Sequence, residues 1–246
     1  MPRTAPDRHT MTSRTESPCK AYIINPPAKF IDHTLLRADA TEADIARLCE
    51  EAVEYGFASV CVPPCHVVQA ARLLYGSEVA VGTVVGFPLG NQTTETKVFE
   101  ARQAVELGAS EVDMVIRIGS ARAADFAAVL EDIHRVVAAA EPALVKVIIE
   151  CCLFDDAVKR RLAEIIAASG AAYVKTSTGF AASGATVDDV RLLAAAVSAR
   201  VKIKAAGGIR DWSTCRAMLA AGAERIGTSA GAAIMQQWHE STGCSR

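Results

Sequence analysis

Several features that mark particular classes of protein are scarce or missing in this sequence. Only 5% of its 246 residues are aromatic, and no apolar run approaches the roughly 20 residues that span a bilayer. The formal net charge is -2 and both signs are mixed along the chain, which leaves no basic face for nucleic acid and no polybasic membrane patch. We therefore expect no nucleic-acid or membrane partner and a small-molecule ligand instead.

Cysteine and histidine spacing excludes two further classes. The eight cysteines form no CxxC pair and are too sparse for a secreted disulfide scaffold; several lie in apolar stretches, where free thiols act as small hydrophobes. The first residues lack the hydrophobic segment of a signal peptide, so we expect a cytoplasmic protein. No HxxxH or His/Cys ligand spacing occurs among His33, His66, His134 and His239, so we expect no metal site.

The chain divides into a polar start and one large domain. Residues 1–28 are rich in Arg, Thr, Ser and Pro, which predicts a flexible N-terminal tail that is disordered or loosely docked. With 51% apolar residues overall, the remaining 29–246 are sufficient for a single domain with an ample core.

A repeated pattern runs through this domain. Four helix-like stretches end in a glycine followed by an apolar strand, and Gly56, Gly108, Gly170 and Gly222 fit the C′ position of a helix, where φ is positive. With a further strand and helix between each pair, the chain gives one βα unit per 26 to 31 residues. We expect strands at residues 29–32, 59–63, 79–87, 111–116, 145–150, 173–178, 201–205 and 225–229.

Eight such units indicate an α/β protein with a closed (β/α)8 barrel, the TIM barrel. The strands are nearly continuous Val, Ile and Ala, as expected when both faces of a parallel sheet are covered. The alternative is a doubly wound open sheet, which the absence of GxGxxG after the first strand disfavours.

Charged residues inside the strands indicate a site. Side chains alternate along a strand, so inward-facing strands would crowd Asp113, Lys146, Lys175 and Lys204 into one small volume. A single strand lysine, such as Lys146 or Lys202, is more often structural, and a Lys/Asp pair can be simple neutralisation. Crowding and burial both lower the pKa of a lysine, and a neutral lysine attacks a carbonyl to form a Schiff base. We predict that Lys175 is this nucleophile and that Lys204 tunes its pKa.

Glycine and hydroxyl residues gather after the last three expected strands, in "TSTGF", "AAGGIRDW" and "IGTSAG". The loops after strands seven and eight of such barrels often bind phosphate through backbone N–H groups, although tight βα turns have a similar composition. We predict substrate or phosphate contacts at Thr178, Gly179, Gly207, Gly208, Gly227 and Ser229, with Arg210 adding charge. Weaker candidates are Asp32, at the expected end of the first strand, Cys61, which could equally be packing, and Lys146.

Seven segments together carry a resemblance to a known family: "FIDHTLL", "SVCV", "VVGFPLGNQTTETK", "EVDMVI", "VKVIIE", "YVKTSTGF" and "KAAGGIR". They resemble the deoxyribose-phosphate aldolases, which are class I aldolases, over residues 29–235. The resemblance implies a (β/α)8 barrel that reversibly cleaves 2-deoxy-D-ribose 5-phosphate to D-glyceraldehyde 3-phosphate and acetaldehyde, with no metal or organic cofactor. It also implies that Lys175 is the Schiff-base lysine, Lys204 the second lysine and Asp113 the acid that works with it in proton transfer.

Other functions are compatible with the same residues. A barrel that binds pyridoxal phosphate also needs a Schiff-base lysine and a phosphate cup, and a non-enzymatic phosphosugar-binding barrel needs only the cup. Arg117, Pro63 and Cys151 depart from the pattern of the resembling family, which bears on substrate range. The sequence leaves the choice between a homodimer and a homotetramer open.

Overall fold

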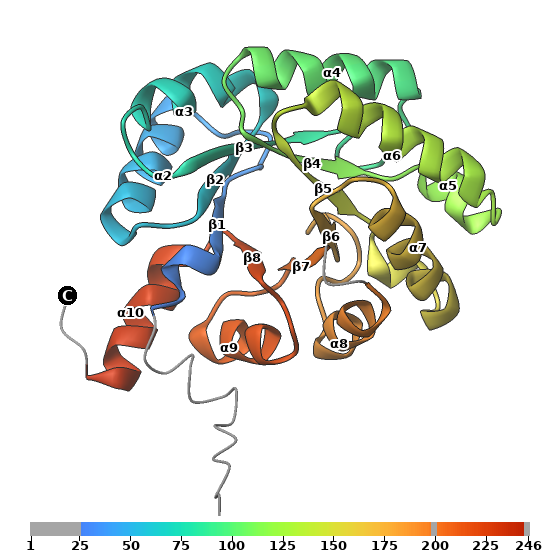
Figure 1. The fold of residues 1–246 in the computed structure, drawn as a ribbon. Helices are drawn as coiled ribbons and strands as arrows, with labels where there is room; N and C mark the ends of the chain where they lie inside the picture. The colour runs from blue at the N-terminus through green and yellow to red at the C-terminus, as the bar shows by residue number, and fades with distance from the viewer. Residues whose placement is uncertain (1–25, 198–200, 244–246) are drawn as a thin grey trace, which may run out of the picture.

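Eight parallel strands close into a barrel in the computed structural model, which describes residues 26–197 and 201–243 (Figure 1). Every strand pairs in parallel with its neighbours in the chain, and the last pairs with the first, so the predicted (β/α)8 barrel is confirmed and the open sheet is wrong. The strands are β1 (Ile31–Thr34), β2 (Ser59–Val62), β3 (Ala80–Val85), β4 (Glu111–Val115), β5 (Leu144–Ile148), β6 (Tyr173–Lys175), β7 (Lys202–Ala206) and β8 (Arg225–Thr228).

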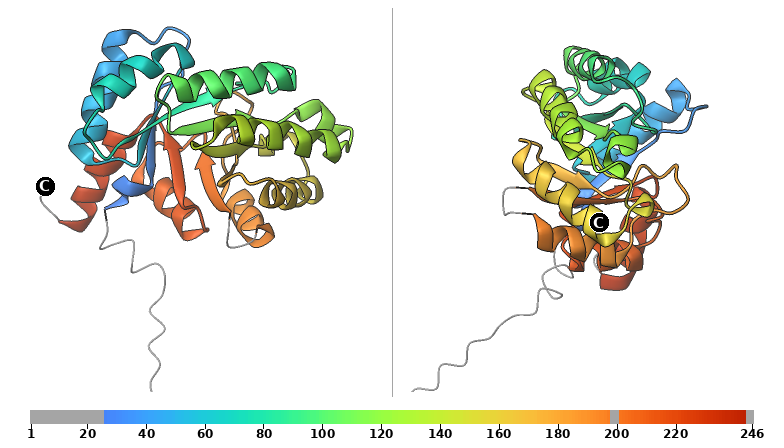
Figure 2. Two further views of the ribbon diagram at one scale, coloured as in Figure 1. Left: turned by 45° about the horizontal axis from the view of Figure 1, so that its top comes forward. Right: turned by 90° about the vertical axis from the view of Figure 1, so that its right-hand side faces the viewer.

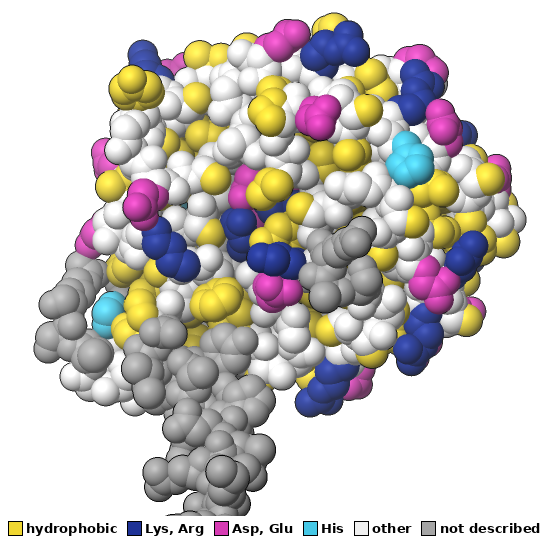
Figure 3. Space-filling view, in the orientation of Figure 1, with side chains coloured by type: hydrophobic (Ala, Val, Ile, Leu, Met, Phe, Trp, Pro, Cys, Tyr) yellow, Lys and Arg dark blue, Asp and Glu magenta, His cyan; other side chains and the backbone are white. Residues whose placement is uncertain are grey.

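Helices surround the strands as an outer layer (Figures 1 and 2). The α-helices are α2 (Glu42–Tyr55), α3 (Val67–Leu73), α4 (Thr94–Glu106), α5 (Ile118–Arg122), α6 (Phe126–Ala140), α7 (Asp156–Ala168), α8 (Val187–Ala196), α9 (Trp212–Ala220) and α10 (Gly231–Thr242). Short 3-10 helices are η1 (Pro27–Phe30), η2 (Pro64–His66) and η3 (Cys151–Leu153). In the described part of the chain, none of the helices combines the length and apolarity needed to cross a membrane. Figure 3 shows one face of the molecule, on which basic and acidic side chains are interspersed.

The predicted helix ends are found. Gly56, Gly108, Gly170 and Gly222 all have positive φ, between 67° and 113°, a region that only glycine enters freely. At the start of α2, Thr41 forms a reciprocal capping box with the residue three positions later. The glycine rhythm of the sequence therefore marks the points where each helix turns back into the barrel.

The first strand begins later than predicted, at residue 31 rather than 29. Pro26 and Pro27 have no N–H to donate to a sheet, and their fixed φ suits the start of a helical turn, so η1 forms first. Of the predicted tail, residues 1–25 lie outside the described part, while Pro27 and Ala28 are buried in η1, which packs beside α10. The shift places Asp32 inside β1, and not at its end.

Two different cores result from this arrangement. Between strands and helices the packing is apolar, with side chains such as Phe57, Ile133 and Leu162 fully buried. Inside the barrel, where layers of Val, Ile and Leu are usual, a group of charged side chains is buried: Asp32, Glu111, Asp113, Lys146, Lys175, Lys204 and Arg225. Burying so many ionisable groups is expensive unless each finds a partner, so the interior is the place to look for function.

Candidate active site

Neighbouring strands bring four predicted residues together in the barrel interior. Asp113 of β4 is the direct register partner of Lys146 on β5, and Lys175 of β6 is the partner of Lys204 on β7. All four residues are buried, none exposing more than 3% of its surface. The strand alternation read from the sequence therefore placed them on the correct face.

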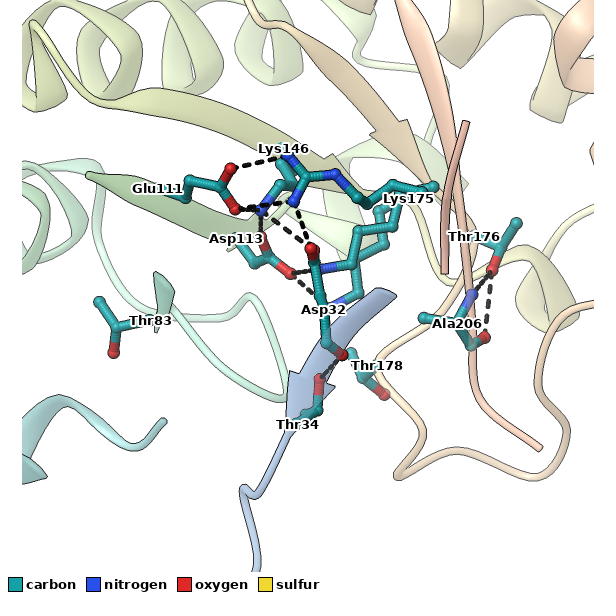
Figure 4. Close-up of polar contacts among 12 residues, drawn as sticks. Asp32, Thr34, Thr83, Glu111, Asp113, Lys146, Lys175, Thr176, Thr178 and Ala206 are labelled. Carbon is teal, nitrogen blue, oxygen red and sulfur yellow. Dashed lines mark hydrogen bonds and ion pairs between the residues drawn. The ribbon is translucent and has the colours of Figure 1, made fainter. Parts of the chain in front are cut away.

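Asp113 is the centre of this group (Figure 4). Its Oδ2 atom accepts hydrogen bonds from the Nζ atoms of both Lys175 and Lys204, each at 2.7 Å. Its Oδ1 atom lies 3.2 Å from Nζ of Lys146. One carboxylate thus faces three lysine amines.

Two further carboxylates complete the network beneath. Asp32 lies 2.5 Å from Nζ of Lys204 and 3.2 Å from Nζ of Lys146, and Glu111 lies 2.5 Å from Nζ of Lys146. Arg225 donates to Asp32 and, at 2.8 Å, to Glu111. Together with Asp113 and Lys175, three carboxylates face four basic groups, so one basic group has no matching charge.

The pKa shifts identify the unmatched group as Lys175. Burial lowers the pKa of Lys175 below its ordinary 10.5, and the nearby Lys204 acts in the same direction, while Asp113 opposes them without prevailing. Burial also acts against the charges of Lys146 and Lys204, but two or three carboxylates each outweigh it and raise the pKa. The expectation that crowding lowers the pKa of every lysine is therefore wrong for Lys146 and Lys204. The carboxylates of Asp113 and Asp32, and for Lys146 also that of Glu111, stabilise their charged forms.

A cavity of about 270 Å³ opens above this network at the C-terminal ends of the strands. Its lining comes from β1, β6, β7, β8 and the loops that follow them, and includes the amine-bearing side chain of Lys175. The other predicted residues on its wall are Thr178, Gly179, Gly207, Gly208, Arg210, Gly227 and Ser229. Among the residues that the structure describes, none with an acidic side chain lines the cavity, so its lining suits an anion.

The local backbone also suits an anion. Gly207 and Gly208 have φ of 89° and 80°, a region that glycine enters freely, and without side chains both residues let an anion approach the backbone closely. Helix α10 begins at Gly231, and its N-cap residue Ala230 has no side chain that could cap it. The Thr228 hydroxyl accepts the N–H of Ala230 at 2.9 Å, and the N–H groups that follow keep the positive end of the helix dipole available. Both features occur after the last two strands, as the sequence predicts.

Three predicted substrate contacts do not line this cavity. Asp32, Cys61 and Lys146 are buried beneath it, and burial raises the pKa of the Cys61 thiol to about 11, which keeps it protonated. Asp32 is low in the barrel because β1 starts late. Lys202 shares a strand face with Lys204 but stands at the opposite end of the barrel, half exposed, 3.7 Å from Glu224.

Sequence reasoning did not identify several residues of the site. Arg225 could have been identified, because an arginine at the start of an otherwise apolar strand needs buried acidic partners. Glu111 could have been identified because strand alternation places it on the same face as Asp113. Arg37 and Phe180 line the cavity from loops, where side-chain direction cannot be read from alternation. The ring of Phe180 also packs edge to face against that of Phe87, with 5.3 Å between the ring centroids, and helps to line a neighbouring cavity.

Glu150 was also missed, and it braces the loop after β6. Its buried carboxylate accepts the Thr178 hydroxyl at 2.5 Å and the Thr178 backbone N–H at 3.3 Å. The hydroxyl in turn accepts the N–H of Phe180 at 3.1 Å. Glu150 has φ of 56°, which strains a residue other than glycine, and such strain is concentrated at functional sites.

Comparisons with known proteins agree over most of the chain. The model of the family described as DeoC/LacD family aldolase matches residues 28–237. A curated deoxyribose-phosphate aldolase of Syntrophotalea carbinolica is 56% identical over 214 residues, 87% of this chain and 97% of that protein. One of Geobacillus sp. is 54% identical over 210 residues, 85% of this chain and 94% of that protein. The solved tetrameric deoxyribose phosphate aldolase of Aeropyrum pernix is 34% identical, with a TM-score of 0.81 over 88% of this chain and 92% of its own. With its barrel, its buried lysines and these relatives, the chain belongs to the DeoC/LacD family of aldolases.

Proposed function

We propose that the protein catalyses the reversible aldol cleavage of 2-deoxy-D-ribose 5-phosphate to D-glyceraldehyde 3-phosphate and acetaldehyde. The observation that carries the proposal is Lys175, a buried amine with a lowered pKa at an anion-compatible cavity. A neutral amine at that position is a nucleophile towards a carbonyl. The named relatives act as supporting precedent for the phosphosugar.

The reaction begins when the Lys175 amine adds to the C1 carbonyl of the open-chain sugar and water is lost, which leaves an imine. Protonated, this imine withdraws the electrons of the C2–C3 bond. A base removes the C3 hydroxyl proton, the C2–C3 bond breaks, and D-glyceraldehyde 3-phosphate leaves. The remaining enamine takes a proton on C2, and hydrolysis of the new imine releases acetaldehyde and restores the amine.

Asp113 and Lys204 are the groups that we assign to proton transfer. Asp113 contacts both lysine amines at 2.7 Å, so it can pass a proton between them or to a water molecule. Burial opposes ionisation of Asp113, but the three lysines hold its pKa well below the ordinary value, so it works as a carboxylate. Lys204, with its raised pKa, is the proton-bearing partner.

The phosphate of the sugar is assigned to the glycine-rich loops after β6, β7 and β8. The proposed contacts are backbone N–H groups of Gly179, Gly207 and Gly208, with Ser229 and Arg210, and Gly227 lies beside them on the cavity wall, near the end of β8. The hydroxyl of Thr178 donates to Glu150, so we assign Thr178 the shaping of the loop.

Trapping the Schiff base tests the proposal. Purified protein is mixed with acetaldehyde and borohydride and then digested, and we expect a stable adduct on Lys175 by mass spectrometry. Lys175→Ala should lose both the adduct and acetaldehyde release from deoxyribose 5-phosphate. Lys202→Ala, at the other end of the barrel, should keep both. An adduct elsewhere, or full cleavage by Lys175→Ala, would contradict the mechanism.

The same preparation separates the two alternative functions. A pyridoxal phosphate protein would absorb at about 400 nm as purified. A binding protein would show phosphosugar affinity with neither adduct nor cleavage. The aldolase is expected to show cleavage, and replacing the lysine that forms the adduct should abolish acetaldehyde release.

Three further properties are part of the proposal. A homodimer or homotetramer is supported by the tetramer described for the Aeropyrum pernix relative, and light scattering on the purified protein would measure it. Cytoplasmic location is supported by the cysteines of the described residues, all of them free thiols. We also propose a single catalytic domain over residues 29–246, with residues 1–28 as its tail. The activity of a chain that lacks residues 1–25 would test this, and it keeps Pro27 and Ala28, which are buried in η1.

A further inference from the structure

Arg37, in the loop after β1, lines the same cavity as Lys175 and Arg210. These are the three charged residues of the cavity wall, and all are basic. Arg37 therefore approaches the cavity from a different loop than the glycine-rich loops assigned above. Because β1 closes the barrel against β8, this loop neighbours the start of α10.

The guanidinium of Arg37 is held in place by two carboxylates. Its Nη1 atom lies 2.8 Å from Asp39 and its Nη2 atom 2.5 Å from Asp44. Asp44 is itself fixed by the capping box of α2, in which it accepts the backbone N–H of Thr41 at 3.0 Å and its hydroxyl at 2.8 Å. The start of α2 is thus an anchor that positions Arg37 at the cavity wall.

This anchoring leaves donors unused. A guanidinium has five N–H groups in a fixed fork, and the carboxylates of Asp39 and Asp44 take one terminal nitrogen each, while Nη1 also donates to the backbone oxygen of Asp39 at 3.4 Å. Two N–H groups of the five are then without a contact, and the side chain is 47% exposed and lines the cavity, so a ligand there can be reached by them. Such a fork matches two oxygens of a phosphoryl group, which carries up to two negative charges.

We propose that Arg37 binds the phosphoryl group of the substrate together with Arg210, and that it sets the preference for phosphorylated over unphosphorylated sugars. The inference rests on the proposed function for the identity of the sugar, but not for the anion site itself. On this account the loop after β1 supplies further N–H donors to the phosphoryl group.

Arg47 offers a matched control for the structural alternative. It also binds Asp44, at 2.6 Å, from an exposed position on α2, but it does not line the cavity. If Arg37 served only to stabilise the start of α2, replacing either arginine would have a similar effect. If Arg37 binds phosphate, only its replacement affects the ligand.

The kinetic experiment compares two substrates. We expect Arg37→Met to lower the ratio of kcat/KM for deoxyribose 5-phosphate to that for deoxyribose by about tenfold, through KM, as for loss of a charge-assisted hydrogen bond. Arg210→Met should do the same, Arg47→Met should leave the ratio as in the wild type, and Arg37→Lys should fall between. An unchanged ratio in Arg37→Met, or an equal loss in Arg47→Met, would overturn the proposal.

A binding experiment separates this proposal from the aldolase assignment. Inorganic phosphate is titrated into the full chain by calorimetry, without any substrate. Weaker phosphate binding in Arg37→Met than in Arg47→Met supports the anion site even if deoxyribose 5-phosphate is not cleaved. Equal affinity in the two variants, in a protein that does cleave it, rejects Arg37 while the proposed function stands.

Discussion

Lys175 and Lys204 donate to the same oxygen, Oδ2 of Asp113, each from 2.7 Å. The two amines differ in what else they contact. Lys204 also lies 2.5 Å from Asp32, whereas the ion pair of Lys175 is with Asp113 alone. The amine with fewer carboxylates is the one that loses its proton more easily, which divides the roles between two chemically identical side chains.

Replacing Lys175 and replacing Lys146 should affect stability in opposite directions. Lys175 has a lowered pKa in the folded state, so below its folded pKa its charge opposes folding; Lys175→Met should raise the Tm at neutral pH. Lys146 has a raised pKa, so its stabilising contribution is fully present below its unfolded pKa and is lost as the pH rises through the folded pKa. Lys146→Met should cost about 1.5–3 kcal/mol, because it removes a charged hydrogen-bond donor to Glu111, although each of the three carboxylates keeps another basic partner.

Thermal and urea unfolding of the two methionine variants at neutral pH would measure this contrast. Both substitutions remove a similar buried amine and fill a similar volume, so each serves as the control for the other. A large loss of stability in Lys175→Met would mean that Lys175 is held as a fully charged partner of Asp113, contrary to the assignment.

Lys204 should set the pH at which Lys175 becomes reactive. Lys204→Leu removes a nearby positive charge and leaves Asp113 more available to Lys175, and both changes raise the pKa of Lys175. The rate of borohydride-trapped adduct formation should therefore reach its midpoint at higher pH than in the wild type. Adduct formation, and not turnover, is measured because Lys204 also takes part in proton transfer.

Lys202→Leu is the control for that shift, since Lys202 lies on the same strand with its side chain 52% exposed. Its midpoint should match that of the wild type. A midpoint that stays in place in Lys204→Leu would show that burial alone lowers the pKa of Lys175.

Glu150 should matter through the loop that it braces. Glu150→Ala leaves the Thr178 hydroxyl and N–H without their buried acceptor, which costs about 1–3 kcal/mol, and should raise KM for the phosphorylated substrate. Glu150→Gln keeps an acceptor oxygen and should lose less. Urea unfolding and steady-state kinetics would measure both effects.

Ala124 provides a control for backbone strain. Among the described residues other than glycine, it and Glu150 have positive φ, and the φ of Ala124 is 57°. Ala124→Gly relieves strain without breaking a side-chain contact and should raise stability by up to about 1 kcal/mol. If Glu150→Ala also stabilised the protein and left KM unaltered, the brace would have no functional role.

Gly184 is required for the loop after β6 to meet the loop after β7. A Cβ atom at Gly184 would lie 2.1 Å from the carbonyl oxygen of Gly207, which is backbone and cannot rotate away. Gly184→Ala should displace the wall of the cavity and lower kcat/KM about 100-fold. Gly119→Ala in α5, where the added Cβ meets nothing within 4 Å, should leave kcat/KM unchanged; equal activity in both variants would contradict the prediction.

Local sequence patterns were sufficient to predict the architecture and the inward direction of the key side chains. Glycines at helix ends and a steady βα spacing follow from local backbone preferences, and strand alternation is a local property too. That is why Asp113, Lys146, Lys175 and Lys204 were predicted on one face. The prediction was wrong at β1, where the strand begins after Pro26 and Pro27 and Asp32 is its second residue and not its last.

Which lysine is reactive, and what surrounds it, depends on contacts between distant parts of the chain. The pKa of Lys175 depends on burial and on carboxylates delivered by other strands, and Coulomb interactions depend on distance in space and not on separation in the chain. Arg225 stands 193 residues from Asp32 and yet binds it. Arg37 reaches the cavity from a loop whose path is set by packing at the start of α2. Charge matching inside the barrel is a property of the closed sheet, and it exists only once β8 has met β1.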